Sequence, residues 1–297
     1  MQAGTLGYKL IRKIKDDKFD EENLHQYALL VQLGARDFQT CVIDETDRVL
    51  LMEDYVFNDV GSVDQQIQIV KDLYDAHPLL MAGFWKSVTF SIKSNKFVQV
   101  PAQLFVQNSA AEYLKFNARI EPEKDQILFC QNSSIESVTV YVAPKPLYDW
   151  LTSVYQNAPL KFIHQSTALI EGVLKISRTG KSGKTSPLYL YVDRFKMHIL
   201  AAQDGQLIYY NQFPIKHFAD YVKYIMLVLT ALGMDQQTSQ VVMWGYIGKN
   251  SPHYHEFIKY IRNVSFGERP DHLNFGYLFD ELQEHHFFDL YSIHLLL

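Results

Sequence analysis

A stretch of alternating apolar and polar residues, 188–215, constrains the fold more than any other part of the sequence. Its apolar residues recur at every second position through three segments, 188–192, 197–201 and 207–210. A two-residue period is typical of β-strands. The break at 203–205, which reads Gln-Asp-Gly, predicts a hairpin turn between the second and third strands. The sequence therefore predicts a meander of three strands.

The same order of elements occurs earlier in the chain. Three strands are predicted there, at 27–33, 38–43 and 49–57. In both copies a helix and a further strand follow: the first helix begins at the capping box Ser62-x-x-Gln65 and precedes a strand at 85–92, and the second ends at Gly233 and precedes a strand at 241–247. Aligning Phe38 with Phe195 gives an offset of 157 residues (195 minus 38) between the copies. The chain is thus predicted to contain one strand-rich unit twice.

The remaining segments predict further helices and a docked tail. Helices are expected at 109–116, from a second capping box at Ser109 and Glu112, and at 144–157, 165–174 and 253–262. Residues 1–22 are expected to form an edge strand or a loosely docked arm. The tail, 273–297, is expected to form a helix and then a strand. Its apolar end, 295–297, would either pack internally or anchor another chain.

Composition places limits on the class of protein. The chain has 297 residues, 47% of them hydrophobic, and a formal net charge of −5, which argues against a generic nucleic-acid surface. Cys41 and Cys130 are the only cysteines, so a disulfide framework is not expected and a reducing compartment is favoured. No segment has the length of a signal peptide core or a membrane span. We expect a cytoplasmic protein.

The duplicated order, with a helix between the copies, resembles the actin-like ATPase fold of actin, sugar kinases, heat-shock chaperone ATPases and actin-like pilus-assembly and cell-division proteins. Residues 164–172, HQSTALIEG, resemble the E-P-x-A-A-x-x-x-G helix of that superfamily, with Ala168 and Gly172 in the small positions. More narrowly, the chain is similar to a family of uncharacterised bacterial proteins with a degenerate actin-like fold, and the ending HHFFDLYSIHLL adds to that likeness.

The resemblance implies an α/β, two-lobed, ribonuclease H-like fold built from a duplicated β-β-β-α-β-α unit. We expect a first lobe at residues 1–163, including the arm at 1–22. The second lobe is expected at 164–297. Its Gly-, Ser- and Lys-rich stretch, 177–187, is expected to be a flexible loop.

The resemblance also implies an Asp-x-Gly hairpin in each lobe, in which the glycine admits phosphate and the aspartate handles Mg²⁺ and its waters. The first hairpin keeps Gly34 but has Gln32 in place of the aspartate. Glutamine is neutral and does not offset the charge of a metal. Asp37 lies near enough in sequence to substitute, although a turn aspartate commonly forms an Asx turn.

The second hairpin and the adenosine loop are also altered. Asp193 is present, but no glycine accompanies it and the turn is expected to be shortened, so an exposed hairpin charge is the simpler interpretation. In the adenosine loop Gly245 and Gly248 remain, and Lys249 stands just before a helix whose free N–H groups could hold an anion. Together with Gln32 and Gly34, these four residues form the predicted degenerate nucleotide cleft.

Other motifs carry less weight. Residues 180–185, GKSGKT, resemble the end of a phosphate-binding loop, but Arg178 replaces the required glycine and a strand follows where a helix should. His253 and His255 have the wrong spacing for one helical face, as do His285 and His286. We therefore predict no catalytic residue and no metal site, and Cys41 is expected in the core.

Three hypotheses follow. The first is a non-catalytic actin-like scaffold that binds a protein partner and needs no cofactor. The second is an ATP-dependent switch or kinase-like enzyme, which would bind Mg·ATP through Asp37, Asp193 and Lys249 in altered geometry. The third is an unrelated α+β binding domain in which the repeat is accidental. Actin-like folds occur as monomers, dimers and filaments, so the oligomeric state stays open.

Overall fold

The computed structural model describes residues 7–179 and 186–297. They form two compact units. The first comprises residues up to Ala168 together with Asp271–Glu281 and Leu296–Leu297, and the second comprises Leu169–Pro270 and Leu282–Leu295. The division predicted from the sequence, at residues 163 and 164, stays a prediction. The stretch expected to be a flexible loop lies largely outside the described residues.

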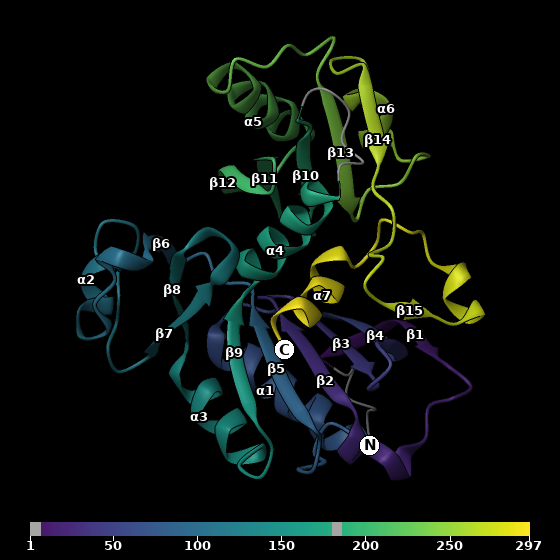
Figure 1. The fold of residues 1–297 in the computed structure, drawn as a ribbon. Helices are drawn as coiled ribbons and strands as arrows, with labels where there is room; N and C mark the ends of the chain where they lie inside the picture. Colours follow the sequence, from purple (N-terminus) through teal and green to yellow (C-terminus); the bar gives the residue numbers. More distant parts are fainter. Residues whose placement is uncertain (1–6, 180–185) are drawn as a thin grey trace. The chain divides into compact units, whose positions relative to one another are not determined.

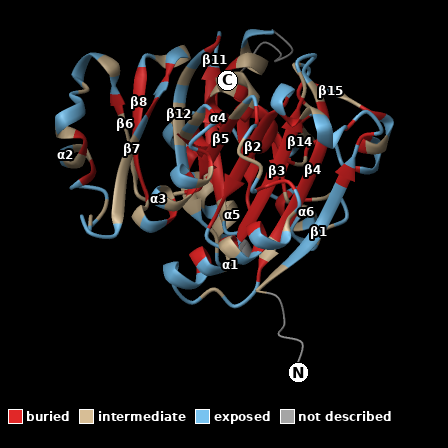
Figure 2. Cartoon of the chain, turned by 90° about the horizontal axis from the view of Figure 1, so that it is seen from below, coloured by how far each residue is buried: buried red, intermediate tan, exposed pale blue. Residues whose placement is uncertain are grey.

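The first unit is built on a mixed sheet of seven strands (Figure 1). In spatial order the strands are β1 (Tyr8–Lys15), β4 (Arg48–Phe57), β3 (Asp37–Ile43), β2 (Ala28–Leu33), β5 (Ser87–Ile92) and β9 (Leu160–His164), while β15 (Asn274–Phe275) pairs with β4. Every residue of β2 and β3 is buried, and Figure 2 shows these strands as the buried centre of the sheet. The expectation of an edge strand within residues 1–22 is confirmed by β1, which pairs only with β4.

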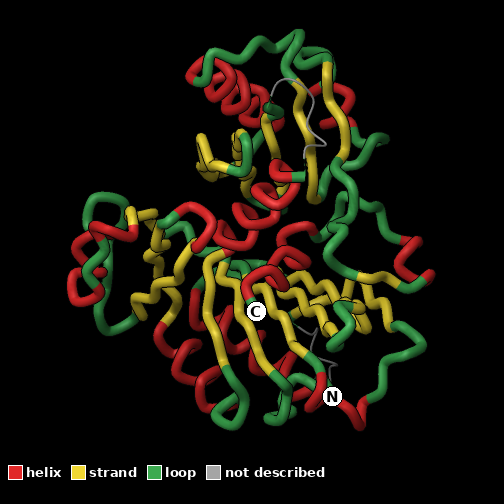
Figure 3. The backbone as a smooth tube through the Cα atoms, viewed as in Figure 1, coloured by secondary structure: helices red, strands yellow, loops and turns green. Residues whose placement is uncertain are grey.

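Two helices cover one face of this sheet, α1 (Val63–Ala76) and α3 (Lys145–Val154) (Figure 3). The Tyr74 ring of α1 packs edge-on against Phe38 and against Trp150 of α3, with ring centroids 5.9 and 4.9 Å apart. The predicted cap of α1 is confirmed, because Ser62 Oγ accepts a hydrogen bond from the Gln65 N–H at 3.2 Å. Short 3₁₀ segments complete the unit, at Glu21–Gln26 (η1) and Tyr277–Glu281 (η5).

A small antiparallel sheet is inserted between β5 and α3. Its strands lie in the order β6 (Phe97–Pro101), β8 (Ser137–Pro144) and β7 (Asp125–Asn132). Between β6 and β7 the chain forms η2 (Ala102–Leu104), η3 (Gln107–Ser109) and α2 (Ala110–Leu114), and η4 (Ser133–Ile135) joins β7 to β8. The predicted second capping box is wrong, since the Ser109 side chain makes no capping bond and α2 ends at Leu114. We call residues 97–144 the inserted subdomain.

The second unit contains a five-stranded sheet in the order β12 (Gln206–Pro214), β11 (Lys196–Gln203), β10 (Leu188–Val192), β13 (Gln240–Gly245) and β14 (Asn263–Phe266). Four helices accompany it: most of α4 (Gln165–Arg178), α5 (Phe218–Ala231), α6 (Pro252–Phe257) and α7 (Phe288–Ser292), which leads into η6 (Ile293–Leu296). The core joins one face of β10, β11 and β13 to α5 through Leu190, Ile199 and Ile225, among others. The predicted hairpin turn is confirmed, because Asp204 and Gly205 both have positive φ, as a two-residue primed turn requires.

The predicted duplication is confirmed by the pairing of strands. β2 pairs antiparallel with β3 and parallel with β5, and β10 pairs in the same way with β11 and β13. The predicted offset of 157 is wrong. Leu33 pairs with Phe38 and Val192 pairs with Met197, so the hairpins correspond at an offset of 159 (192 minus 33, and 197 minus 38). Accordingly Phe38 is buried, whereas Phe195 is 47% exposed.

Two further predictions are wrong. The tail reverses the expected order, because the short strand β15 comes first and the helix α7 follows. The helix expected at 253–262 ends at Phe257. Beyond it, Ile261 is fully buried and packs in the core, whereas Ile258 and Tyr260 are exposed. Within the described ranges, no helix combines the length and apolarity needed to cross a bilayer.

Candidate functional site

The hairpin between β2 and β3 contains a buried ion pair. Lys93 Nζ lies 2.7 Å from Asp37 Oδ2, and the two side chains are only 3% and 4% exposed. Lys93 directly follows β5, and its N–H donates to the Leu33 carbonyl at 2.9 Å. The parallel pairing of β5 with β2 therefore places Lys93 beside the turn that joins β2 to β3. Sequence reasoning missed Lys93, although a lysine directly after a buried strand was a usable signal.

Gly34 is required by this ion pair. A Cβ atom at Gly34 would lie 1.9 Å from Asp37 Oδ1 and 3.0 Å from Lys93 Cδ. The Gly34 N–H donates to the Asp37 carbonyl at 3.0 Å, and its own carbonyl accepts from Gln66 Nε2 at 2.6 Å. Packing against Asp37 and Lys93 is thus sufficient to explain a glycine at position 34, without a bound phosphate.

Gln32 belongs to a buried polar row that crosses four strands at one register. Ser91 Oγ donates to Gln32 Oε1 at 3.1 Å, and Gln32 Nε2 donates to Gln39 Oε1 at 3.0 Å. Gln39 Nε2 in turn donates to Asp54 Oδ1 at 3.2 Å. All four side chains are buried. Both amide atoms of Gln32 are therefore engaged with neighbouring strands.

The hairpin of the second unit has the same length as the first. The Asp193 N–H donates to the Lys196 carbonyl at 2.9 Å, in the position of the Gly34–Asp37 bond. The predicted shortening of this turn is therefore wrong. The interpretation of Asp193 as an exposed charge is also wrong, because this residue is only 4% exposed and Asp193 Oδ1 accepts from the Arg194 N–H at 2.8 Å.

At the offset of 159, Asp193 in the second copy is equivalent to Gly34 in the first, and Tyr191 is equivalent to Gln32. Tyr191 is fully buried, and its hydroxyl donates to Asp289 Oδ1. Burial, with the nearby Asp289 charge, raises the pKa of Tyr191 well above its ordinary value. In the second unit an aromatic side chain thus stands where the resemblance implies a metal-handling aspartate, and an aspartate stands where it implies the glycine.

The loop after β13 is shaped by tight backbone packing. Gly245 has φ +95°, and a Cβ there would lie 2.1 Å from the Val192 carbonyl oxygen. The Gly245 N–H donates to the His285 carbonyl at 2.8 Å, and the His285 ring lies 2.7 Å from the Ile247 carbonyl. Burial lowers the pKa of His285. These contacts give Gly245 a structural role in closing the end of the sheet.

The other two residues of the predicted adenosine loop are less constrained. Gly248 faces open space. Lys249 Nζ lies 5.9 Å from the centre of the Phe266 ring. The helix that follows is only six residues long, and the Tyr254 N–H in its first turn already donates to Ser251 Oγ at 3.1 Å. Within each unit the predicted residues therefore take part in local packing: Gln32 and Gly34 in the first, and Asp193, Gly245 and Lys249 in the second.

The remaining motifs have simple outcomes. The Walker-like stretch at 180–185 lies outside the described residues. Among the residues that are described, no group of three His, Cys, Asp or Glu side chains has a geometry that could hold a metal ion. Cys41 is fully buried, as predicted, and its burial raises the pKa of the thiol.

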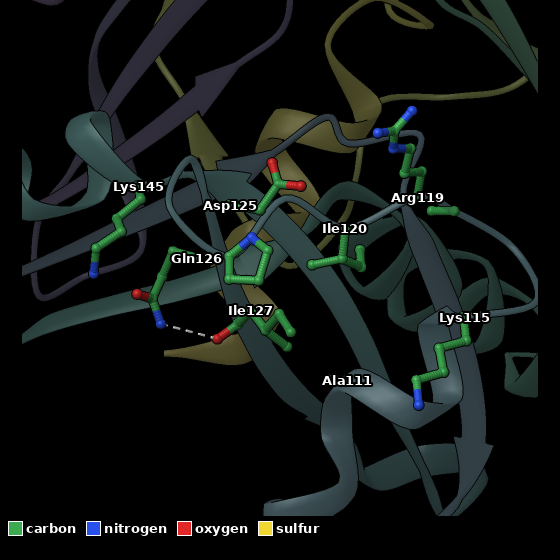
Figure 4. A pocket seen from close by; sticks show the side chains of 10 residues that line it. Ala111, Lys115, Arg119, Ile120, Asp125, Gln126, Ile127 and Lys145 are labelled. Atoms are coloured by element: carbon green, nitrogen blue, oxygen red, sulfur yellow. Dashed lines mark hydrogen bonds between the residues drawn. The ribbon is translucent and has the colours of Figure 1, made fainter.

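A pocket of about 670 Å³ lies in the first unit, between the inserted subdomain and the start of α3 (Figure 4). Its apolar residues are Ala111, Ala118, Ile120, Pro122 and Ile127, and its polar residues are Lys115, Arg119, Asp125, Gln126 and Lys145. Ile120 and Ile127 pack against the core of the inserted subdomain. Volumes of this size are typical of ligand pockets. Nothing in the sequence pattern had pointed to it.

The duplicated sheets and hairpins define a protein with the actin-like ATPase fold. The structure is similar to a Bacteroides thetaiotaomicron protein with actin-like ATPase fold and unknown function, with a TM-score of 0.75 and 20% identity over 93% of this chain and 98% of that one. It is also similar to the PilM–PilN type IV pilus biogenesis complex, with a TM-score of 0.58 and 11% identity over 91% and 98% of the two chains.

The chain belongs to the protein family of unknown function DUF3822, whose model matches residues 16–264. A comparison with functionally curated proteins gave no match. At these low identities the solved structures establish the fold alone.

Proposed function

We propose that this protein is a non-catalytic member of the actin-like class, which binds a protein partner and has lost the nucleotide chemistry of the fold. The observation that carries the proposal is the buried Lys93–Asp37 ion pair, which fills the first hairpin beside Gly34. A phosphate loop needs exposed backbone N–H groups and close approach to a glycine. Here side chains of the protein itself occupy that approach.

The neighbouring groups support the same proposal. Magnesium favours carboxylate ligands, but the acidic position of the first hairpin is occupied by the neutral Gln32, both of whose amide atoms are bonded. The equivalent position in the second unit is occupied by Tyr191. These substitutions remove, in each unit separately, the group that would hold the metal.

A partner-binding role is supported by the likeness to PilM, which was solved as a complex with PilN. The net charge of −5 favours a protein partner over nucleic acid. The two free, buried cysteines are compatible with the expected cytoplasmic location. Self-association is included in the proposal as one form of partner binding.

Isothermal titration of the full-length protein with ATP, with and without Mg²⁺, tests the loss of nucleotide binding. The proposal expects no saturable heat up to millimolar ATP in either condition. A saturable, Mg²⁺-dependent signal would favour the alternative, an ATP-binding switch or kinase-like enzyme. Substitutions of Asp37, Asp193 and Lys249 would then identify the site.

A further inference from the structure

The pocket of the inserted subdomain is lined by more basic than acidic side chains, and the rest of its lining is largely apolar. Three of its lining residues are basic and one is acidic. The acidic residue is already neutralised, because Asp125 Oδ2 lies 2.7 Å from Lys96 Nζ and accepts from the Glu121 N–H at 2.9 Å. Lys115 pairs with Glu112 on the surface of the protein.

The other two cations of the pocket have no such partner. Neither Arg119 nor Lys145 forms an ion pair with a described residue, although the Glu121 carboxylate interacts with Arg119 at longer range. Figure 4 shows them at opposite sides of the pocket, with Ile120 and Ile127 between them. An anionic group on an occupant would pair with Arg119 or Lys145, and an aliphatic group would pack on the two isoleucines.

The inserted subdomain also exposes large apolar side chains outside the pocket lining. Phe116 lies beside the lining residue Lys115 and is 96% exposed. In the segment that leads to α2, Leu104 and Val106 are 66% and 56% exposed, although the Tyr113 hydroxyl holds their backbone through the Leu104 carbonyl and the Val106 N–H. Large apolar side chains on an ordered backbone are typical of protein-binding surfaces. They favour a protein partner for this subdomain over a small metabolite.

We infer that the pocket lined by Ile120, Ile127, Arg119 and Lys145 binds a short peptide segment of a partner protein, in which an acidic residue neighbours an aliphatic one. This inference deepens the proposed function, and rests on it, by assigning the partner site to the inserted subdomain. The aliphatic side chain would enter between the two isoleucines. The carboxylate would accept hydrogen bonds from the guanidinium of Arg119 or the ammonium of Lys145.

Selection of phage-displayed random heptapeptides on the immobilised full-length protein tests the inference, followed by titration of the enriched peptides in solution. The expected peptides contain Asp or Glu next to Leu, Ile or Val. Their affinity should fall about tenfold or more in the variant Arg119→Glu/Lys145→Glu, because charge-assisted hydrogen bonds are lost and repulsion replaces them. Ala118→Trp, which fills the pocket without changing its charge, should weaken binding as well.

The matched control is Lys9→Glu/Arg12→Glu, which makes the same charge change on the exposed face of β1. It should leave the affinity unchanged. Enriched peptides without acidic residues, equal binding to the pocket variant, or competition by acetate or succinate alone would each overturn the inference. If the peptide experiment fails and the protein binds no ATP, only the assignment of the site to this pocket is removed. Saturable Mg·ATP binding would instead overturn the proposed function, whatever the peptide experiment gives.

Discussion

Lys93 and Asp37 form an ion pair at 2.7 Å inside the first hairpin, with both side chains almost fully buried. The pair joins the end of β5 to the start of β3 and packs on Gly34, where a Cβ would clash with the aspartate. The position at which an actin-like hairpin would admit phosphate is thus part of the hydrophobic and ionic core of the unit. In the proposed function, the ion pair that stabilises this hairpin is also the feature that closes it to phosphate.

Replacing Lys93 by Met should destabilise the protein by about 3–5 kcal/mol, because Asp37 would remain buried without its counter-ion. The free energy of unfolding in urea measures this loss. The double variant Lys93→Met/Asp37→Leu should recover most of it, since no uncompensated charge remains. Lys15→Met is the matched control: its ion pair with Glu21, at 3.0 Å, is exposed and should contribute less than about 1 kcal/mol. Equal losses in Lys93→Met and Lys15→Met would refute the prediction.

Replacing Gly34 by Ala should destabilise the protein by about 1–3 kcal/mol, because the new methyl group must displace Asp37 or Lys93. Gly248→Ala offers the comparison, since a Cβ at Gly248 meets no atom within 4 Å. That variant should change the free energy of unfolding by no more than about 0.5 kcal/mol. An unchanged free energy of unfolding in Gly34→Ala would mean that the hairpin is packed more loosely than its contacts indicate.

The buried carboxylate of Glu53 should make stability depend on pH in the acid range. Burial by itself raises the pKa of Glu53, but the hydrogen bond and charge of His77, at 2.7 Å, and the charge of Lys13 outweigh it and lower the pKa to about 2. A carboxylate with a lowered pKa stabilises the folded state above its unfolded pKa, and this contribution is lost as pH falls toward the folded pKa.

The stability difference between the wild type and Glu53→Gln should therefore shrink by roughly 3 kcal/mol as the pH falls from about 5 to about 2. Urea unfolding at a series of pH values measures it. Glu21→Gln, at an exposed ion pair, is the control and should change the free energy of unfolding at neutral pH by less than about 1 kcal/mol. A difference between wild type and Glu53→Gln that grows with acidity would have the wrong sign for this account.

Much of the fold was predictable because its signals are local. The alternation in 188–192 and 197–201, and the cap at Ser62, report the conformation of their own segments, and the resulting order of elements was enough to predict the actin-like fold. The tail was not predictable in this way. The strand β15 is only two residues long and depends on pairing with β4, and the sequence does not carry that distant contact in its periodicity.

The candidate site was harder to predict because it depends on register. A shift of two residues between the copies hid the equivalence of Asp193 with Gly34 and of Tyr191 with Gln32, which only the strand pairing reveals. The role of Lys93 depends on the parallel pairing of β5 with β2, between residues far apart in the chain. Arg119 and Lys145 are likewise brought to one pocket by the inserted sheet.

A thermal melt of the full-length protein with and without millimolar Mg·ATP tests the central claim most directly. A ligand that binds only the folded state, at about a hundred times its Kd, adds roughly 2.7 kcal/mol to stability, which corresponds to several degrees in Tm. The account predicts the same Tm in both conditions. A rise of several degrees that requires both Mg²⁺ and ATP would contradict it and would favour a working nucleotide site.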